Sequence, residues 1–322
     1  MTRIRRLELA DPATVRILLP VYQSVVAEEL PDDPEPTASE LAHVLTPRAK
    51  RESAVFAAFH GDTAVGFAAV AHSRLINPPL AVGYLLVSPS HRRWGTGSEL
   101  LRRTLNESAA TGQDHVVFEA PDTSTVEAFA KATSGRRVFT DYRSLLELRP
   151  AGTEAPSPAG SSRAPYRTVR WTDRCPDQLL DSYATARAHI LDAPSGDLSV
   201  PMHRPDAEEV RTDERILRQI ALRQYVVAAV TPEEQVAGYV QLFAWDTFQG
   251  VQEHTVVVPD HRGRGLALKL RREATDWIRA HEPHLTRLQV MNDSANTWIH
   301  AVNDRLGWVR DRSWSGWEYS TS

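Results

Sequence analysis

The sequence is short of several features that would each indicate a particular class of protein. It has one cysteine, Cys175, in 322 residues, which excludes an internal disulfide framework and any metal site built from several cysteines. No apolar run is long enough to span a bilayer, and the basic start of the chain lacks the apolar stretch of a secretory signal. The net charge of -4 gives no general attraction to nucleic acid or to an anionic membrane. We therefore expect a cytoplasmic protein that binds no metal, nucleic acid or membrane.

The length of the chain and one unusual segment predict two domains of similar size. A chain of 322 residues exceeds what one hydrophobic core usually serves. Residues 150–165 are rich in Pro, Gly, Ala and Ser and have almost nothing to bury, which is typical of a linker. We expect an N-terminal domain over residues 1–149 and a C-terminal domain over residues 166–322.

The two halves carry the same short pattern. Its members in the first half are Val87, Pro89, His91, Arg92 and Gly95. They recur 170 positions later as Val257, Pro259, His261, Arg262 and Gly265. In both halves the pattern lies between an apolar strand and an amphipathic helix. Two divergent copies of one domain are the simplest explanation.

Each copy is predicted to have an α/β (α+β) fold, with a mixed, mostly antiparallel sheet flanked by helices. In the first half, residues 14–30 have helical periodicity, and residues 53–73 predict two strands joined by a turn. In the second half, residues 177–191 and 208–222 predict helices before a further pair of strands. A third strand, the shared turn, a helix and another strand then follow in both halves.

The shared turn has the composition of a phosphate-binding loop. In "HRGRGLA", residues 261–267, glycines let the backbone approach a ligand and arginines add positive charge. The first turn of the helix that follows has N–H groups without partners, at the positive end of the helix dipole. The triphosphate-binding motif G-x-x-x-x-G-K-[ST] and the dinucleotide motif G-x-G-x-x-G are both missing here. The alternative interpretation is a basic surface loop without a ligand. The occurrence of two such turns at equivalent positions of the two halves makes this alternative less favoured.

With these residues in view, the sequence resembles the GNAT acetyltransferase superfamily. That family's acetyl-coenzyme A motif is V-x-P-x-x-[QR]-x-x-G-x-[GA] between a strand and a helix. The second half fills it with Val257, Pro259, Arg262, Gly265 and Ala267. The first half fills it with Val87, Pro89, Arg92, Gly95 and Gly97. Residues 296–308, "NTWIHAVNDRLGW", are similar to the family's closing pattern, with Asn296 and Gly307 matching. The tandem arrangement also resembles that of mycothiol synthase, although its acceptor residues cannot be matched here.

The resemblance implies two GNAT-like domains with splayed central strands, and acetyl-coenzyme A as the cofactor. It implies that the turn binds the pyrophosphate and that the strand edge and Asn296 bind the pantetheine arm. The implied cofactor-binding residues of the second half are Val256, Val257, Val258, Arg262, Gly263, Arg264, Gly265, Leu266, Ala267 and Asn296. Those of the first half, where binding of coenzyme A stays open, are Val87, Arg92, Arg93, Gly95, Thr96 and Gly97. A backbone donor facing the thioester carbonyl would form an oxyanion hole.

The resemblance also suggests a general base, because an amine must lose its proton before it attacks a thioester. In related enzymes the base lies about nine residues before the motif Arg or Gln, which gives Glu253, with His254 beside it. The same count in the first half gives Gly83, next to Tyr84. Alternation along a strand predicts that Glu253 and His254 point to opposite faces. Glu253 is the favoured base and His254 the second candidate; a solvated carboxylate and a structural histidine are the alternatives.

The usual acid of the family, a closing Tyr, is missing from both halves. Its position falls at Asn303 in the second half and near Phe129 in the first. A coenzyme A thiol can leave as a thiolate without an acid, so this substitution does not exclude activity. It does motivate an alternative function, a non-catalytic acyl-coenzyme A sensor or scaffold.

These observations predict an acetyl-coenzyme A-dependent N-acetyltransferase that acts on a small-molecule primary amine by direct transfer. The first copy is expected to be degenerate and non-catalytic and the second catalytic, in a monomer or homodimer. Mycothiol-type or antibiotic-modifying acetylation are further alternatives. Asp192 and Asp197 lie in the insert over residues 192–211, where they could receive a cationic amine. A plain surface loop is the other interpretation of that insert.

Overall fold

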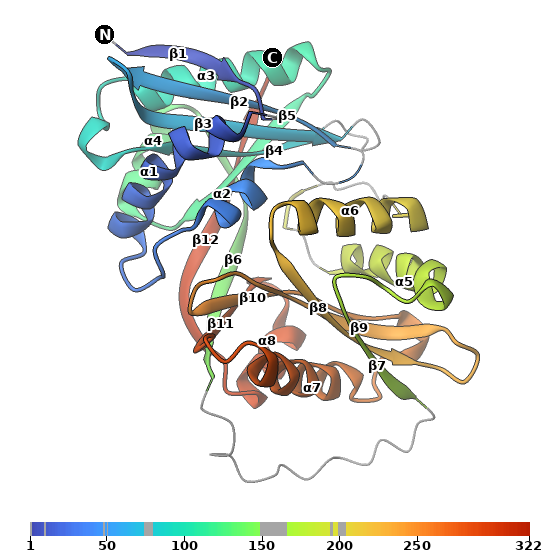
Figure 1. Cartoon of the computed structure of the whole chain (residues 1–322). Coiled ribbons are helices and arrows are strands. Elements are labelled where there is room, and N and C mark those ends of the chain that lie inside the picture. The colour runs from blue at the N-terminus through green and yellow to red at the C-terminus, as the bar shows by residue number, and fades with distance from the viewer. Residues whose placement is uncertain are drawn as a thin grey trace. The chain divides into compact units, whose positions relative to one another are not determined.

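The computed structural model describes residues 2–9, 11–47, 49, 51–73, 80–148, 166–193, 196–198 and 204–322. The predicted linker over residues 150–165 lies outside them. The chain forms two compact units (Figure 1). Unit 1 comprises Met1–Thr140, Ser195–Pro201 and Ser313–Ser322, and unit 2 comprises Asp141–Pro194 and Met202–Arg312. Among the described helices, none is both long and apolar enough to cross a membrane.

Unit 1 is a sheet with helices on both faces. The strand order is β1-β2-β3-β4-β5-β12, antiparallel except between β4 and β5. The strands are β1 (Arg3–Leu7), β2 (Arg51–His60), β3 (Thr63–Ser73), β4 (Leu80–Val87), β5 (His115–Pro121) and β12 (Val309–Ser320). The helices are α1 (Pro12–Glu29), α2 (Ala38–Leu45), α3 (Thr96–Ala110) and α4 (Ser124–Ala132), with a 3-10 turn, η1, at Pro89–His91. Strand alternation divides the core, because Val55 packs with α1 and α2 whereas Phe56 packs with α3.

Unit 2 repeats this architecture. Its strand order is β6-β11-β10-β9-β8-β7, antiparallel except between β10 and β11. The strands are β6 (Arg136–Glu147), β7 (Arg167–Thr172), β8 (Arg223–Val230), β9 (Val236–Ala244), β10 (Gln249–Val257) and β11 (Arg287–Asp293). The helices are α5 (Leu180–Arg187), α6 (Ala207–Gln219), α7 (Leu266–His281) and α8 (Thr297–Arg305), with 3-10 turns η2 (Asp177–Leu179), η3 (Ala188–Asp192) and η4 (Pro259–His261). α5 and α6 pack on one face of the sheet and α7 on the other. The predicted mixed, mostly antiparallel α/β fold is confirmed.

Each unit takes its last strand from the other half of the sequence. The C-terminal strand β12 pairs antiparallel with β5 of unit 1, where Trp317 lies opposite Phe118. Strand β6, which ends the first half, pairs antiparallel with β11 of unit 2, where Leu145 lies opposite Gln289. Trp317 and Tyr319 are buried in the core of unit 1. The compact units therefore differ from a plain division of the chain at residues 150–165, because each closing strand is exchanged.

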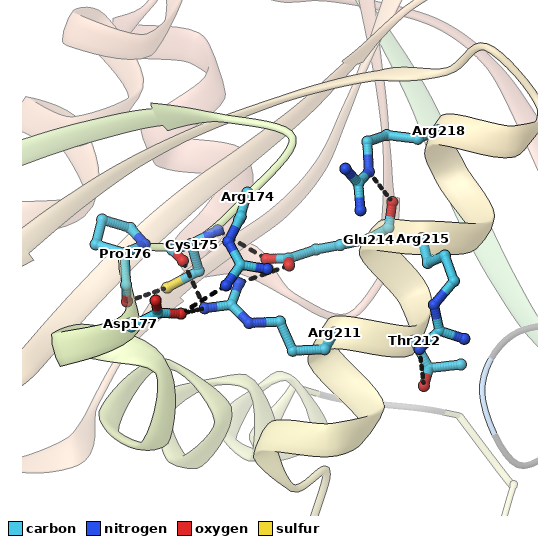
Figure 2. Close-up of polar contacts among 9 residues, drawn as sticks. All are labelled: Arg174, Cys175, Pro176, Asp177, Arg211, Thr212, Glu214, Arg215 and Arg218. Carbon is cyan, nitrogen blue, oxygen red and sulfur yellow. Dashed lines mark hydrogen bonds and ion pairs between the residues drawn. The ribbon is translucent and has the colours of Figure 1, made fainter.

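A network of ion pairs and hydrogen bonds fixes α6 beside the segment that leads into α5 (Figure 2). The buried carboxylate of Glu214 accepts hydrogen bonds from the backbone N–H of Cys175 at 2.7 Å and from Arg211 at 2.7 Å. Arg211 also donates to the Cys175 carbonyl at 2.8 Å, and Arg174 pairs with Asp177 at 2.8 Å. Burial and the Glu214 charge raise the pKa of the Cys175 thiol to about 12. The thiol therefore stays protonated at neutral pH, which makes it a poor nucleophile.

Candidate functional site

Two central strands separate in each unit, as the resemblance to the GNAT superfamily implies. In unit 1 the parallel pairing of β4 with β5 covers Leu80 to Gly83, and β4 continues to Val87. In unit 2 the parallel pairing of β10 with β11 covers Gln249 to Val251, and β10 continues to Val257. Beyond the last pair, one backbone edge of each strand is available to an extended ligand that adds to the sheet.

Strand β10 contains a β-bulge that is not found in the described pairing of β4. The pairing of β10 with β9 shifts register between Gln252 and His254, so Glu253 is an extra residue in the strand. The pairing of β4 with β3 runs without a shift from Val87 to Ala81. Matching the two strands from their shared ends places His254 against Tyr84 and Gln252 against Gly83. The expected match of Glu253 with Gly83 is therefore wrong, because the inserted residue changes the offset; Glu253 has no counterpart.

Tyr239, a buried residue of β9, contacts His254 and is affected electrostatically by Glu253. The Tyr239 hydroxyl and His254 Nδ1 are 3.4 Å apart, and the two rings lie edge to face at 6.2 Å. Burial raises the pKa of Tyr239, the positive charge of Arg187 opposes this, and the Glu253 charge raises it again. The alternation that would send Glu253 and His254 to opposite faces is interrupted at the bulge. The His254 imidazole and the Tyr239 phenol thus lie together, and the charge of the neighbouring Glu253 raises the pKa of that phenol.

Aromatic and charged side chains from α5 and α6 surround this point. Tyr183 lies edge to face with Tyr239 at 4.9 Å, and burial raises its pKa as well, followed by the effect of Tyr239. Arg187 forms an ion pair with Asp213 at 3.0 Å. It also interacts electrostatically with the phenols of Tyr183 and Tyr239. The two tyrosines stay neutral at ordinary pH, so they can donate or accept hydrogen bonds but do not act as anionic bases.

The shared turns begin their helices without a side-chain cap. The N-caps of α3 and α7 are Gly95 and Gly265, with φ angles of 79° and 74°, and neither helix has a capping side chain among the described residues. Five other helices are capped by side-chain oxygens, namely those of Asp11, Thr37, Thr123, Asp206 and Asn296. The first N–H groups of α3 and α7 therefore face outward at the positive end of the helix dipole. This is the geometry of an anion-binding site.

The two glycines of the turn in unit 2 are uncrowded on their Cβ side. An added Cβ on Gly263 or on Gly265 would have no described atom within 4 Å. Gly263 has a φ of 73°, in the left-handed region that favours glycine, and Arg93 takes its place in unit 1 with a φ of 67°. The glycine at this position therefore serves the backbone conformation and leaves the surface open.

The motif arginine ties the strand to the preceding helix in both units. Arg262 Nε donates to the Val257 carbonyl at 2.9 Å, and its guanidinium forms an ion pair with Asp192. Arg92 Nε likewise donates to the Val87 carbonyl at 3.2 Å, and Nη1 pairs with Glu29 at 2.7 Å. Burial raises the pKa of Asp192, but the hydrogen bonds from Arg262 and His189 outweigh it and lower the pKa. The arginine anchors the turn, and the carboxylate neutralises much of its charge.

Arg264 is the second arginine of the turn. It donates to the Tyr166 hydroxyl at 2.9 Å and to the Asp260 carbonyl at 3.1 Å. Tyr166 is itself 2.7 Å from His261 Nδ1. Both of these acceptors are uncharged oxygens, so the hydrogen bonds do not neutralise the guanidinium beside the start of α7.

Most of the other predicted cofactor-binding residues next to the turn are buried. Val256 and Val257 are buried on opposite faces of the sheet, and Val258 donates its N–H to the Ala237 carbonyl at 3.0 Å. Leu266 and Ala267 are buried under the sheet at the start of α7. Because the side chains of Val256, Val257, Leu266 and Ala267 are buried, any ligand contact of these four residues comes from their backbone.

Two asparagines of the closing pattern make hydrogen bonds within the fold. Asn296 Oδ1 accepts from the Ile299 N–H at 3.2 Å and so caps α8. Asn303, at the position of the usual acid, is buried and donates from Nδ2 to Asn292 Oδ1 at 3.0 Å.

Asp192 and Asp197 are assigned to different compact units. Asp192 belongs to unit 2, whereas Asp197 belongs to unit 1 and donates its N–H to the Val138 carbonyl at 2.9 Å. The described residues contain no group of three or more His, Cys, Asp or Glu placed to hold a metal ion.

Sequence reasoning missed the residues that surround Glu253. Tyr239 lies within a strand whose residues are all buried, and nothing in that pattern separates it from an ordinary core aromatic. Arg187 lies at the end of a helix with no acidic neighbour at helical spacing that would mark it. The closeness of these two residues to Glu253 depends on how the helices pack on the sheet, which the sequence pattern does not specify.

The model of the acetyltransferase (GNAT) family matches residues 18–132 and 192–308. The chain belongs to this family. The two matches place one copy of the GNAT acyltransferase domain in each half and cover more than half of the chain. The comparison with curated proteins gives no match.

Solved structures share the GNAT fold over the whole chain. A tandem GNAT protein from the clavulanic acid biosynthesis pathway is 21% identical with a TM-score of 0.82, covering 100% of this chain and 99% of that one. A GCN5-related N-acetyltransferase from Sphaerobacter thermophilus is 18% identical with a TM-score of 0.66, covering 99% and 96%. A putative acetyltransferase from Pyrococcus horikoshii is 14% identical with a TM-score of 0.54, covering 100% and 90%. At these identities the likeness concerns the fold.

Proposed function

We propose that unit 2 is an acetyl-coenzyme A-dependent N-acetyltransferase for a small-molecule primary amine, and that unit 1 is non-catalytic. The observation that carries this proposal is the bulge in β10. It adds Glu253 to the strand at the point where β10 and β11 separate. Strand β4 of unit 1 has the same separation and the same turn, but its pairing is regular.

The residues of the turn fit the pyrophosphate of coenzyme A. The uncapped start of α7, the open space over Gly263 and Gly265, and the charge of Arg264 together suit a diphosphate. The backbone of Val256 to Val258 and the side chain of Asn296 would hold the pantetheine arm. Acetyl-coenzyme A supplies the acetyl group as an activated thioester.

Glu253 would remove the proton from the acceptor ammonium, directly or through a water molecule. Its side chain is exposed and can therefore meet an amine from solvent. His254 is the second candidate, and its contact with Tyr239 suits it better to orienting the site. Asn303 cannot act as an acid, but a thiol with a pKa near 8.5 can depart as a thiolate without one.

The acceptor is proposed to approach from the side of Tyr239 and α5. Asp192 and Asp197 remain predictions for its recognition. The ion pair of Asp192 with Arg262 supports a different role for that carboxylate, which is to position the turn.

Thiol release from acetyl-coenzyme A across a panel of primary amines tests the function. Glu253→Gln should lower kcat by about 100-fold or more, the usual contribution of a general base, while the affinity for acetyl-coenzyme A is retained. Glu233→Gln, on the exposed β8–β9 turn, is the matched control and should leave turnover unchanged. Unchanged turnover in Glu253→Gln would remove Glu253 as the base. Binding of acetyl-coenzyme A without turnover of any amine would favour the sensor alternative.

A further inference from the structure

Helix α7 carries a fully buried arginine whose terminal nitrogens lack partners. Arg271 Nε donates to Gln252 Oε1 at 3.2 Å. Nη1 and Nη2 are both buried and have no hydrogen-bond partner among the described residues. Burial lowers the pKa of Arg271 to about 9, and no carboxylate among the described residues offsets this effect. Buried charges in proteins are normally paired, because an unpaired one costs several kcal/mol.

This guanidinium lies beside the point where the central strands separate. Its partner Gln252 follows Val251, the last residue of β10 that pairs with β11, and precedes the bulge residue Glu253. The Gln252 amide is buried and is held in place by donating to Thr255 Oγ1 at 3.2 Å. The unpaired cation is therefore connected to the same few residues of β10 that form the proposed reaction centre.

A third buried donor lies next to the guanidinium. The Arg271 Cζ atom is 5.0 Å from the centre of the Trp308 ring. Trp308 Nε1 is also buried, with no partner in the described part of the chain. The guanidinium and the Trp308 ring are in cation–π contact, so the two Arg271 nitrogens and Trp308 Nε1, all without a described acceptor, belong to one buried polar cluster.

Unit 1 shows that the fold does not require this polar cluster. The counterpart of Arg271 in α3 is Leu101, which is buried in the core of unit 1. The counterpart of Gln252 in β4 is Gly83. The same helix and strand thus pack with apolar residues in the copy that has no bulge. The arginine occurs only in the copy with Glu253, which connects it with a ligand of that copy.

We propose that Arg271 binds a carboxylate at the far end of the acyl group, so that unit 2 takes carboxyacyl-coenzyme A thioesters as donors. This inference rests on the proposed acyltransferase function. The two terminal nitrogens of a guanidinium match the two oxygens of a carboxylate. An anion of a single atom could not accept from both nitrogens in this paired geometry. In the transfer, the amine nitrogen bonds to the acyl carbon as the carbon–sulfur bond breaks. Glu253 takes one proton from the ammonium before the attack, and the sulfur leaves as thiolate. The second proton, which the nitrogen loses as the amide forms, passes to that thiolate and gives the coenzyme A thiol, while the distal carboxylate is unchanged.

Binding measurements with succinyl- and butyryl-coenzyme A test the proposal, because the two acyl chains have equal length and differ in the carboxylate. Isothermal titration of the full chain should give at least tenfold tighter binding of succinyl-coenzyme A. Arg271→Leu should abolish this preference, and Leu101 at the equivalent position indicates that the variant folds. Arg271→Met is a second variant with a more flexible side chain. Arg272→Leu, at the exposed neighbouring position of α7, should keep the preference.

Several outcomes would overturn the proposal. Equal affinity of the wild type for the two thioesters would do so, as would a preference that persists in Arg271→Leu. If acetyl- and butyryl-coenzyme A bind and succinyl-coenzyme A has no advantage, this inference fails and the proposed function stands. If no coenzyme A thioester binds, both fail.

Discussion

Asp141 gives a stability prediction whose size follows from its surroundings. On β6 it lies directly opposite Asp293 of β11. Burial, and then the Asp293 charge, raise the pKa of Asp141 from 3.8 to about 6. The folded state therefore holds the proton more tightly than the unfolded state. The stability of unit 2 should be highest below the unfolded pKa, fall as the pH rises from about 4 to about 6, and stay level above that.

The expected magnitude follows from two pKa units. At 1.36 kcal/mol per unit, the full linkage would be about 3 kcal/mol. Asp141 is only partly buried, so solvent screens the charge and we expect about 1–2 kcal/mol. Asp141→Asn removes the titrating group. The variant should therefore be more stable than the wild type by this amount at pH 7.5, and no more stable at pH 4.

Urea unfolding between pH 4 and pH 8 measures this difference. Asp304→Asn, an exposed position on α8, is the control and should give no pH-dependent change. A gain in Asp141→Asn that is the same at every pH would mean that the charge of Asp141 is not the cause. A loss of stability at pH 7.5 would mean that the ionised carboxylate is stabilised in the folded state, and would refute the reasoning.

Two further predictions concern the turn and the exchanged strand. Gly263→Ala should destabilise unit 2 by about 1 kcal/mol, because its φ of 73° is unfavourable for a residue with a Cβ. Arg93→Gly should stabilise unit 1 by a similar amount, and equal signs for the two changes in denaturant unfolding would contradict the conformational argument. Deleting residues 313–322 removes the partner strand of β5 together with the buried Trp317 and Tyr319, so unit 1 should lose several kcal/mol. Hydrogen exchange should then accelerate in β4 and β5 while β8 and β9 stay protected, and a loss confined to unit 2 would count against the strand assignment.

The features that the sequence predicts correctly are determined by local patterns. The repeat, the turn and the helix after it depend on spacing and amphipathic periodicity, which are present in any single copy. Gly95 and Gly265, which the shared pattern places at the start of a helix, are the N-cap residues of α3 and α7. The two helices and the strand pair expected between residues 177 and 245 also lie where they were predicted, with shifted ends.

The features that escaped prediction depend on partners distant in the chain. β6 and β12 are similar closing strands, and their sequences do not specify whether they pair with the sheet of their own half or of the other. The bulge adds one residue to an otherwise regular strand, so counting back from Arg92 gives a false match at Gly83. Arg271 did leave a signal, since it lies on the apolar stripe of α7 with Ala267, Leu270 and Ala274. An arginine on a buried stripe is a polar group that needs a partner.

Comparing the two copies distinguishes the features that the fold itself needs from those that are found only in unit 2. The turn, the uncapped helix start and the arginine that hooks onto the strand recur in both units, so they depend only on the local strand–turn–helix geometry. The inserted Glu253 and the buried pair of Gln252 and Arg271 occur only in unit 2. If the cluster stabilised the fold, the copy without it should show a defect at the same place, whereas Leu101 is buried there in a continuous apolar core. The cost of burying Arg271 without a counter-charge is therefore more readily explained by a ligand than by the architecture.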